Sequence, residues 1–219
     1  MRSTSLVSAP VLMFLTIGCG PFGVIGSGTA KTESREFGGF TAIHFSGVGK
    51  LVVEQTGKES LSVTADDNIV PLLDSSVSDG TLHLGVKSGD TISPKTPIEF
   101  KVGVKDLSKV IVSGAGNTDI KQLKTDKLDV SISGVGNVTA AGSADNLKLV
   151  ISGTGNFNGE KFAVKRASVA CDGVGNAVVD VSDSLDAKIS GVGSIEYLGK
   201  PEVKQSVTGV GSVKKRQGN

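Results

Sequence analysis

Apolar and polar residues alternate along the second half of the chain, and the alternation returns at a nearly fixed interval. One stretch carries apolar residues at Leu128, Val130 and Ile132, with polar residues between them. A period of two residues is typical of a β-strand that buries one face. No stretch between residues 106 and 213 shows the 3.6-residue period of an amphipathic helix. The pattern therefore predicts an all-β structure in this half of the chain.

Each apolar stretch is followed by a glycine-rich motif such as "SGVGN" at residues 133–137. Seven copies begin at Ser46, Ser113, Ser133, Ser152, Asp172, Ser190 and Thr208, and the last six are 20, 19, 20, 18 and 18 residues apart. A strand, a glycine-rich corner, a second strand and a return loop at this period describe one rung of a parallel β-helix. The irregular spacing disfavours a left-handed helix of strict hexapeptides, so we expect a right-handed one over residues 106–213. The motif glycines are expected to allow positive φ angles and close backbone approach at each corner.

In-register stacking of the rungs would align equivalent residues in columns. The motif asparagines are expected to form a hydrogen-bonded ladder of Asn117, Asn137, Asn156 and Asn176. Four residues before each motif, the outward column reads Lys109, Asp129, Lys148, Ser168, Asp186 and Lys204. Opposite charges on neighbouring strands stabilise a sheet weakly. This column therefore supports the register and indicates no binding site.

Residues 36–105 show a different pattern. Strand-like stretches at 40–45, 50–54 and 61–64 precede Asp79-Gly80, which lies between alternating residues and is a strong hairpin signal. The second motif copy follows the first only after 67 residues. We therefore expect an antiparallel-rich β portion that starts the helix and covers its end, where open strand edges would invite aggregation.

The N-terminus resembles a targeting segment. The apolar run at residues 11–17 is too short to span a membrane but suits a secretory signal peptide over residues 1–19. The stretch Leu15–Cys19 is similar to a bacterial lipobox, in which Cys19 would be lipidated; cleavage after Ala30 is the alternative. Residues 20–35, rich in Gly, Ser and Thr, are expected to be a flexible tether, and residues 214–219 a basic tail. Both alternatives place the protein outside the cytoplasm, as a secreted or envelope protein.

The serial "ISGVGN" rungs, together with "GFTAIHFSGVGKLVVEQTG", "VSDGTLHL" and "IEYLGKPEVKQSVTGVGSV", resemble the bacterial head GIN domain family of putative autotransporter adhesins. The resemblance covers residues 36–213, read as a single domain. It implies a right-handed β-helix-like fold, a secreted or envelope location and a suspected adhesion role. The family supplies no catalytic residues to transfer, and fold alone does not determine function.

The amino-acid composition argues against nucleic-acid binding and against a disulfide framework. The 23 Lys and Arg residues nearly balance the 22 Asp and Glu residues, so the net charge is +1. A nucleic-acid partner is not expected, because binding to phosphates requires a basic face. With Cys19 in the signal region, Cys171 is the one cysteine left, so no disulfide framework is expected.

Several residues are candidates for functional sites. His44 and His83 each lie between apolar strand neighbours and are interpreted as outward-facing strand residues, whereas Cys171 shares the register of buried isoleucines. Asp66-Asp67-Asn68 could hold a cation, but a polar turn is favoured. A polysaccharide lyase would need a carboxylate cluster, for which the candidates are Asp126, Asp129, Asp180, Asp183 and Asp186, interleaved with Lys127 and Lys188.

The sequence thus favours a non-enzymatic β-helical envelope protein without cofactor, metal or catalytic residues, which binds an unknown cell-surface or polysaccharide partner. Membrane contact is expected only through a lipid anchor at Cys19. Two alternatives remain open. One is a carbohydrate-active β-helical enzyme, either a lyase or a hydrolase. The other is a passive structural module that assembles with further copies of itself.

Overall fold

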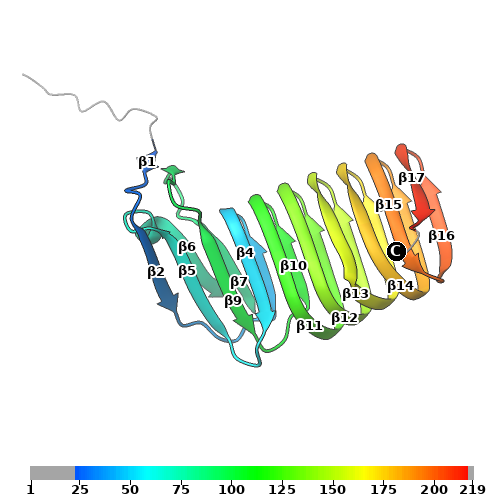
Figure 1. The fold of residues 1–219 in the computed structure, drawn as a ribbon, viewed down its shortest axis with the longest axis horizontal. Coiled ribbons are helices and arrows are strands. Elements are labelled where there is room, and N and C mark those ends of the chain that lie inside the picture. The colour runs from blue at the N-terminus through cyan, green and yellow to red at the C-terminus, as the bar shows by residue number, and fades with distance from the viewer. Residues whose placement is uncertain (1–22, 217–219) are drawn as a thin grey trace, which may run out of the picture.

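The chain forms a β-solenoid in which successive coils stack in parallel, as Figure 1 shows from one side. The structure, a computed structural model, describes residues 23–216. The coils are built by β10 (Lys109–Val112), β11 (Ala115–Ile132), β12 (Val135–Ile151), β13 (Thr154–Cys171), β14 (Val174–Ile189), β15 (Val192–Gly199), β16 (Glu202–Val207) and β17 (Val210–Lys215). Each of these strands pairs in parallel with an equivalent strand one coil away. The predicted stacked β-helix is therefore confirmed.

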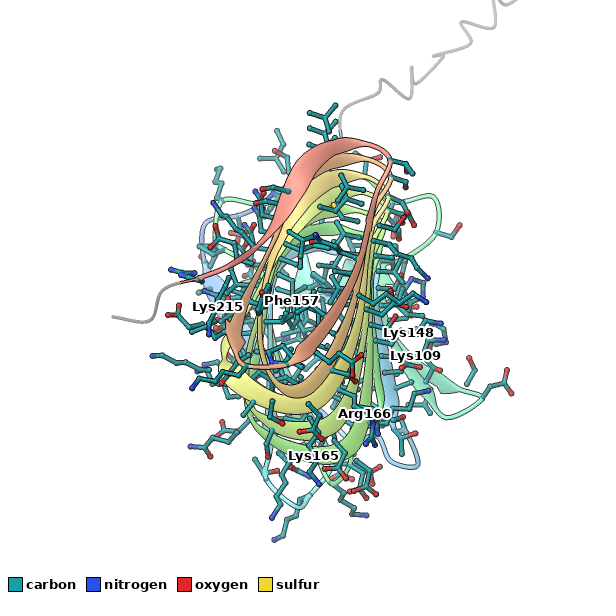
Figure 2. All side chains as sticks on the ribbon, turned by 90° about the vertical axis from the view of Figure 1, so that its right-hand side faces the viewer. Lys109, Lys148, Phe157, Lys165, Arg166 and Lys215 are labelled. Atoms are coloured by element: carbon teal, nitrogen blue, oxygen red, sulfur yellow. The ribbon has the colours of Figure 1, made fainter. Side chains whose placement is uncertain are left out.

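The apolar columns form the core that the alternation predicted. Ile132 pairs with Val112 on one side and Ile151 on the other, and all three side chains are buried. Buried aliphatic side chains with a few phenylalanines fill the inside of the coil, as the end-on view in Figure 2 shows around Phe157. The alternation of buried and exposed residues along β11–β14 follows from the two-residue period of a strand.

The expected return loop is absent from the complete coils. β11 and β13 each run without interruption for 18 residues, and they bend around the wide end of the coil instead of breaking. The register shifts between Ile120 and Leu123, and Gln122 has a φ of 52°. A bulge bends a strand while keeping most of its ladder, so one long strand serves both faces of the coil.

The glycine motifs form the sharp corner, but close approach explains them better than backbone conformation. Gly49 has a positive φ of 111°, whereas Gly116 and Gly136 have ordinary φ values. A Cβ on Gly136 would overlap the carbonyl oxygen of Gly116, and one on Gly116 would overlap that of Gly49. The expectation of positive φ at every corner is thus wrong. Glycine is required because successive corners stack backbone on backbone.

The asparagine ladder is present as expected. The Nδ2 atom of Asn137 donates to Oδ1 of Asn117 at 3.1 Å, and Nδ2 of Asn156 donates to Oδ1 of Asn137 at 2.9 Å. Asn176 continues the ladder to Asn156 at 3.1 Å. Ser194 ends it by donating its hydroxyl to Oδ1 of Asn176 at 2.7 Å. Each amide therefore stabilises the register between two coils.

The first motif copy belongs to the solenoid although it lies far away in the sequence. β3 (Ala42–Phe45) and β4 (Val48–Gln55) pair in parallel with β10 and β11. Beneath them, β7 (Thr81–Val86) pairs with β3, and β9 (Glu99–Val104) pairs with β4, again in parallel. Coiling therefore begins within residues 36–105, as expected for the portion that starts the helix, and the strands that continue the coil are parallel.

Antiparallel strands close the N-terminal end, as predicted for part of residues 36–105. β5 (Ser60–Asp66) pairs with β9, and β6 (Leu73–Ser78) pairs with β7 through the predicted Asp79-Gly80 hairpin. The 3₁₀ turn η1 (Val70–Leu72) precedes β6. Ile69, Val70 and Leu73 are at most 2% exposed and seal this end of the core.

The expectation of a flexible tether over residues 20–35 is wrong for the part that the structure describes, because this part contains two strands. β2 (Ala30–Arg35) pairs antiparallel with β5, and β1 (Val24–Ile25) pairs with β8 (Ile92–Ser93). The Arg35 guanidinium donates to the carbonyl oxygens of Leu73 and Val70 at 2.9 and 3.0 Å. Backbone and side-chain hydrogen bonds therefore hold residues that composition alone suggested were free. Residues 20–22, the signal segment and Cys19 lie outside the described residues.

The basic tail also begins later than expected. Lys214 and Lys215 are part of β17, and Nζ of Lys214 lies 3.1 Å from a carboxylate oxygen of Glu196. The parallel ladder continues to Tyr197 and Lys215, so the strand includes the first lysines of the run. Of the predicted tail, residues 217–219 lie outside the described part of the chain.

Candidate binding groove

The Asp66-Asp67-Asn68 segment is a structural anchor. Asp66 is fully buried, and its carboxylate accepts hydrogen bonds from the backbone N–H groups of Gly28, Lys95 and Thr96 at 2.7 to 3.0 Å. Burial raises the pKa of this carboxyl, but the hydrogen bonds from Thr96 and Gly28 outweigh burial and hold the pKa below its ordinary value. The donors around Asp66 occupy the positions that a cation would need. The preferred interpretation as a turn is supported.

The two histidines form a pair that the sequence did not reveal. His44 and His83 are direct cross-strand neighbours, with ring centroids 5.5 Å apart. Nε2 of His44 lies 2.7 Å from Oγ of Ser113, and Nε2 of His83 lies 3.0 Å from Oγ of Ser78. Burial, and then the charge of His83, lower the pKa of His44. The pair is half-buried, unlike the fully outward strand residues that alternation suggested.

Cys171 is buried in the core column, as predicted, and its thiol donates to the carbonyl oxygen of Gly175 at 3.3 Å. Burial, together with the charge of Asp172, raises the pKa of this thiol. A thiol kept protonated is a poor nucleophile. Cys171 therefore acts as a small core residue.

The carboxylates considered for a lyase separate into two groups. Asp129 and Asp186 lie in the outward column, where each is near the lysine two residues away on its own strand: Lys127 at 2.9 Å and Lys188 at 3.5 Å. Lys109 and Lys148 of the same column lie on one flat side in Figure 2. The predicted register of this column is confirmed, but its ion pairs run along strands and not between them. Asp126 and Asp180 instead line a groove elsewhere, and Asp183 lies outside its lining, where its carboxylate accepts a hydrogen bond from the Ser182 hydroxyl at 2.6 Å.

This groove, here called the bend groove, lies where the long strands turn at the wide end of the coil, near Lys165 in Figure 2. Its volume is about 640 Å³. Small residues from neighbouring coils, Ser143, Ala163 and Ser182, leave room for it. Its charged groups are Lys124, Asp126, Asp145, Lys165 and Asp180. The coil thus replaces large outward side chains by small ones where its strands bend, and so creates a concave polar surface.

Two of the five charged groups of the bend groove form an ion pair between coils. Nζ of Lys165 lies 2.8 Å from Oδ1 of Asp145. The hydrogen bond from Lys165 lowers the pKa of Asp145, and the same bond raises the pKa of Lys165. Both groups are therefore ionised at neutral pH. Beside them, Nε of Arg166 donates to Oδ1 of Asn146 at 2.9 Å and continues the polar row.

The sequence pattern does not single out Asp145 and Lys165. They lie 20 residues apart, which is the length of one coil, so an alignment of charged residues by the motif period would have paired them. No residue-type motif marks them. The groove itself depends on a strand bend that the sequence pattern did not predict.

A second surface runs along the sharp corner. The third motif position points outward, and its valines are 39% to 71% exposed; this column, the valine edge, consists of Val48, Ala115, Val135, Thr154, Val174, Val192 and Val210. It contains most of the large exposed apolar side chains of residues 23–216. Exposed apolar patches commonly mark interaction surfaces. A shallow hollow of about 480 Å³ lies along this edge, but it offers few free polar groups because the adjacent asparagines bond to one another.

Comparison with known families matches residues 39–201 to the family described as "Putative auto-transporter adhesin, head GIN domain". The chain belongs to this family. The match covers the first six of the seven glycine motifs. The head GIN domain therefore includes the solenoid and its N-terminal cover.

Solved structures share the head GIN fold. A putative adhesin from Bacteroides fragilis is 28% identical, with a TM-score of 0.75, and the match covers 89% of this chain and all of that one. A putative lipid binding protein from Parabacteroides distasonis is 24% identical, with a TM-score of 0.58 over 89% of this chain and 99% of that one. A putative adhesin from Parabacteroides merdae is also 24% identical, with a TM-score of 0.53 and the same coverage. The last two support the fold alone.

Comparison with curated proteins finds no match. Among the described residues, no helix is both long and apolar enough to cross a membrane. The same residues contain no group of three or more His, Cys, Asp or Glu side chains arranged to hold a metal ion.

Proposed function

We propose that this protein is an adhesin-like module of the bacterial envelope that binds a glycan in the bend groove without transforming it. The family description and the Bacteroides fragilis neighbour, both named as adhesins, support an adhesive role. The choice of a glycan as the ligand rests on the shape and chemistry of the bend groove. A β-solenoid supplies a rigid surface, and rigid surfaces bind at a lower entropic cost.

The chemistry of the groove matches a polyhydroxylated ligand. Carboxylates of Asp126 and Asp180 accept hydrogen bonds from hydroxyl groups, while Lys124 donates. Ala163, which is exposed, adds apolar surface against which the C–H face of a sugar can pack. The volume of about 640 Å³ lies within the usual range for ligand sites. Groups from successive coils can contact successive units of an extended chain.

The ionisation states of Asp145 and Lys165 favour binding over catalysis by these two residues. A general acid in a glycosidase needs a carboxyl whose pKa is raised, and a lysine base needs a pKa that is lowered. The ion pair moves the pKa of Asp145 down and that of Lys165 up, which is opposite to both needs. These two residues therefore serve as fixed hydrogen-bonding groups in the proposed site.

The envelope location forms part of the proposal. Lipidation of Cys19 would anchor the chain at its N-terminus, where a diacylated residue gives the two lipid chains that stable attachment requires. In Figure 1 the described chain begins at the covered end of the solenoid, near β1. Attachment at that end would leave the bend groove and the opposite end of the solenoid free for partners.

The test is a glycan array, followed by titration calorimetry with the polysaccharides that bind. Ala163→Trp fills the floor of the groove at an exposed position and should abolish binding. Ser168→Trp places the same side chain on the flat side of the same strand and should leave binding intact. Equal binding by both variants would refute the groove as the site.

The enzyme alternative is tested with the same polysaccharides. Incubation with the wild-type protein should release no new reducing ends and no unsaturated products. If such products appear and Asp126→Asn or Asp180→Asn removes them, the protein is a carbohydrate-active enzyme and the binding proposal is wrong.

A further inference from the structure

The two ends of the solenoid differ in how they are finished. The antiparallel strands and η1 seal the N-terminal end. At the other end, β16 pairs only with β14, and β17 pairs only with β15, within the described residues. Val203 and Val213 face the core there but are only half-buried, and Val207 is 41% exposed. At this end each strand therefore has one unpaired edge, and the core is incompletely covered.

The free hydrogen-bonding groups can be assigned residue by residue. The N–H groups of Thr208 and Val210 donate to Ile189 and Gly191 of the preceding coil, and that of Arg216 donates to Tyr197; at the corner between the strands Gly209 also donates to Ile189. Since successive residues of a strand point their backbone groups to opposite sides, even-numbered residues bond inward to the solenoid. The odd-numbered residues of β16 and β17 direct their N–H and C=O groups out of the open end. A row of such groups is a template for another strand.

We propose that the open end binds a second copy of this chain, end to end, with β16 of each copy antiparallel to β17 of the other. The two copies are related by a two-fold axis that passes through the corner at Thr208, along the strand direction. This inference is independent of the proposed glycan site. It gives a closed dimer, because the interface uses the same surface on both copies and the other end is sealed.

The geometry of one coil selects this pairing. β16 and β17 run in opposite directions on the two faces of the coil, so a two-fold axis in the plane of the coil brings β16 over the partner's β17 in antiparallel orientation. A coil rises by about 4.8 Å per turn, and β17 thus lies about half that distance beyond β16. If β16 paired with β16 of the second copy and β17 with its β17, a gap would remain on one face. Pairing β16 with β17 closes both faces equally.

The same axis fixes the register. It pairs residues that are equally far from Thr208, so Val203 lies opposite Val213 of the second copy. Both residues have free backbone groups and both face the core, so their hydrogen bonds and apolar contacts form together. Glu202, which has no ion-pair partner among residues 23–216, lies opposite Lys214. Lys204 lies opposite Ser212, so no like charges are opposed within β16 and β17, although Lys200 and Arg216, just outside these strands, would face each other.

The alternative occupant is solvent, with the lysines at this end preventing association. Lysine on an edge strand is a common protection against pairing. Here, however, the outward lysines face Glu202 and Ser212 in the register that the two-fold axis imposes. Charge complementarity favours the second copy. So does the position of the free backbone groups, which belong to odd-numbered residues on both β16 and β17.

Disulfide trapping tests the proposal in a full chain that carries Cys19→Ser. Lys204 and Ser212 would form a non-hydrogen-bonded antiparallel pair, whose Cα atoms are about 4.5 Å apart and suit a disulfide. Within one chain these two residues lie on different faces of the coil. Lys204→Cys with Ser212→Cys should therefore give covalent dimers on a non-reducing gel. The control, Ser206→Cys with Ser212→Cys, is displaced by two residues and should remain monomeric.

Sedimentation velocity gives an independent readout on the wild-type protein. The average mass should rise toward that of two chains, and no further, as concentration increases. Glu202→Lys should weaken this association, since it opposes Lys214 in the second copy, while Val135→Lys on the valine edge should not. A single monomer species at the highest concentration would overturn the proposal. So would a dimer that cross-links through the displaced pair, or species larger than dimers.

Discussion

Substitution of Gly136 by alanine tests why the motif is kept in every coil. The added Cβ would overlap the carbonyl oxygen of Gly116 in the coil below. Both atoms belong to paired backbones, so neither can move without separating the two coils. Forcing extra volume into a packed site costs about 1–3 kcal/mol. Loss of one neighbouring hydrogen bond, such as that between Thr154 and Gly134, adds about 1 kcal/mol.

We therefore expect Gly136→Ala to lower the free energy of unfolding by about 2–4 kcal/mol. For a chain of this size each kcal/mol corresponds to about 2–4 °C in Tm. Calorimetry and urea denaturation measure the change. Gly38→Ala is the matched control, because its Cβ would meet only a Glu59 carboxylate oxygen at 3.4 Å and its φ is not positive. That variant should remain within about 1 kcal/mol of the wild type.

A third variant separates the two explanations for the glycine. If positive φ were the reason, Gly136→Asn would be tolerated better than Gly136→Ala, because asparagine adopts the left-handed region more readily. Because close approach is the reason, asparagine should be at least as destabilising as alanine. A wild-type Tm for Gly136→Ala, or full rescue by asparagine, would refute the stacking argument.

Three further predictions concern the core, pH dependence and attachment. Ile132→Asp should unfold the protein or destabilise it severely, since it buries a carboxylate without a partner, whereas Asp129→Ser should cost less than about 1 kcal/mol; equal losses in a urea titration would show that the register is wrong. His44 has a lowered pKa in the folded state, so its contribution to stability is fully present above its ordinary pKa of 6.5 and is lost as pH falls below that value. His44→Gln should flatten the pH dependence of the urea midpoint in this range, and an unchanged slope would contradict the assignment. Metabolic labelling with a palmitate analogue should mark the wild type and not Cys19→Ser; label that persists in the variant, or a mature N-terminus at Lys31, would exclude the anchor.

The sequence alone determined the coil and its register. Alternation of the kind seen at Leu128, Val130 and Ile132 permits one face to be buried, and a motif period of 18–20 residues aligns these faces. Such information is local and repeated, so it can be read without knowing distant contacts. The asparagine ladder followed from the same period, because equivalent residues must meet when coils stack.

Only the tertiary structure decided what depends on contacts between unlike segments. The first motif copy joins the solenoid across 67 residues because its strands fit beneath β10 and β11. Residues 30–35 form a strand because β5 offers an unpaired edge and Arg35 finds carbonyl oxygens at η1, and neither partner is visible in their own composition. The bend groove likewise arises where a strand bulge, small side chains of three coils and the Asp145–Lys165 pair come together. Periodicity determines which residues stack, but strand bends, edges and long-range hydrogen bonds determine where the coil begins, where it opens and what its surface can bind.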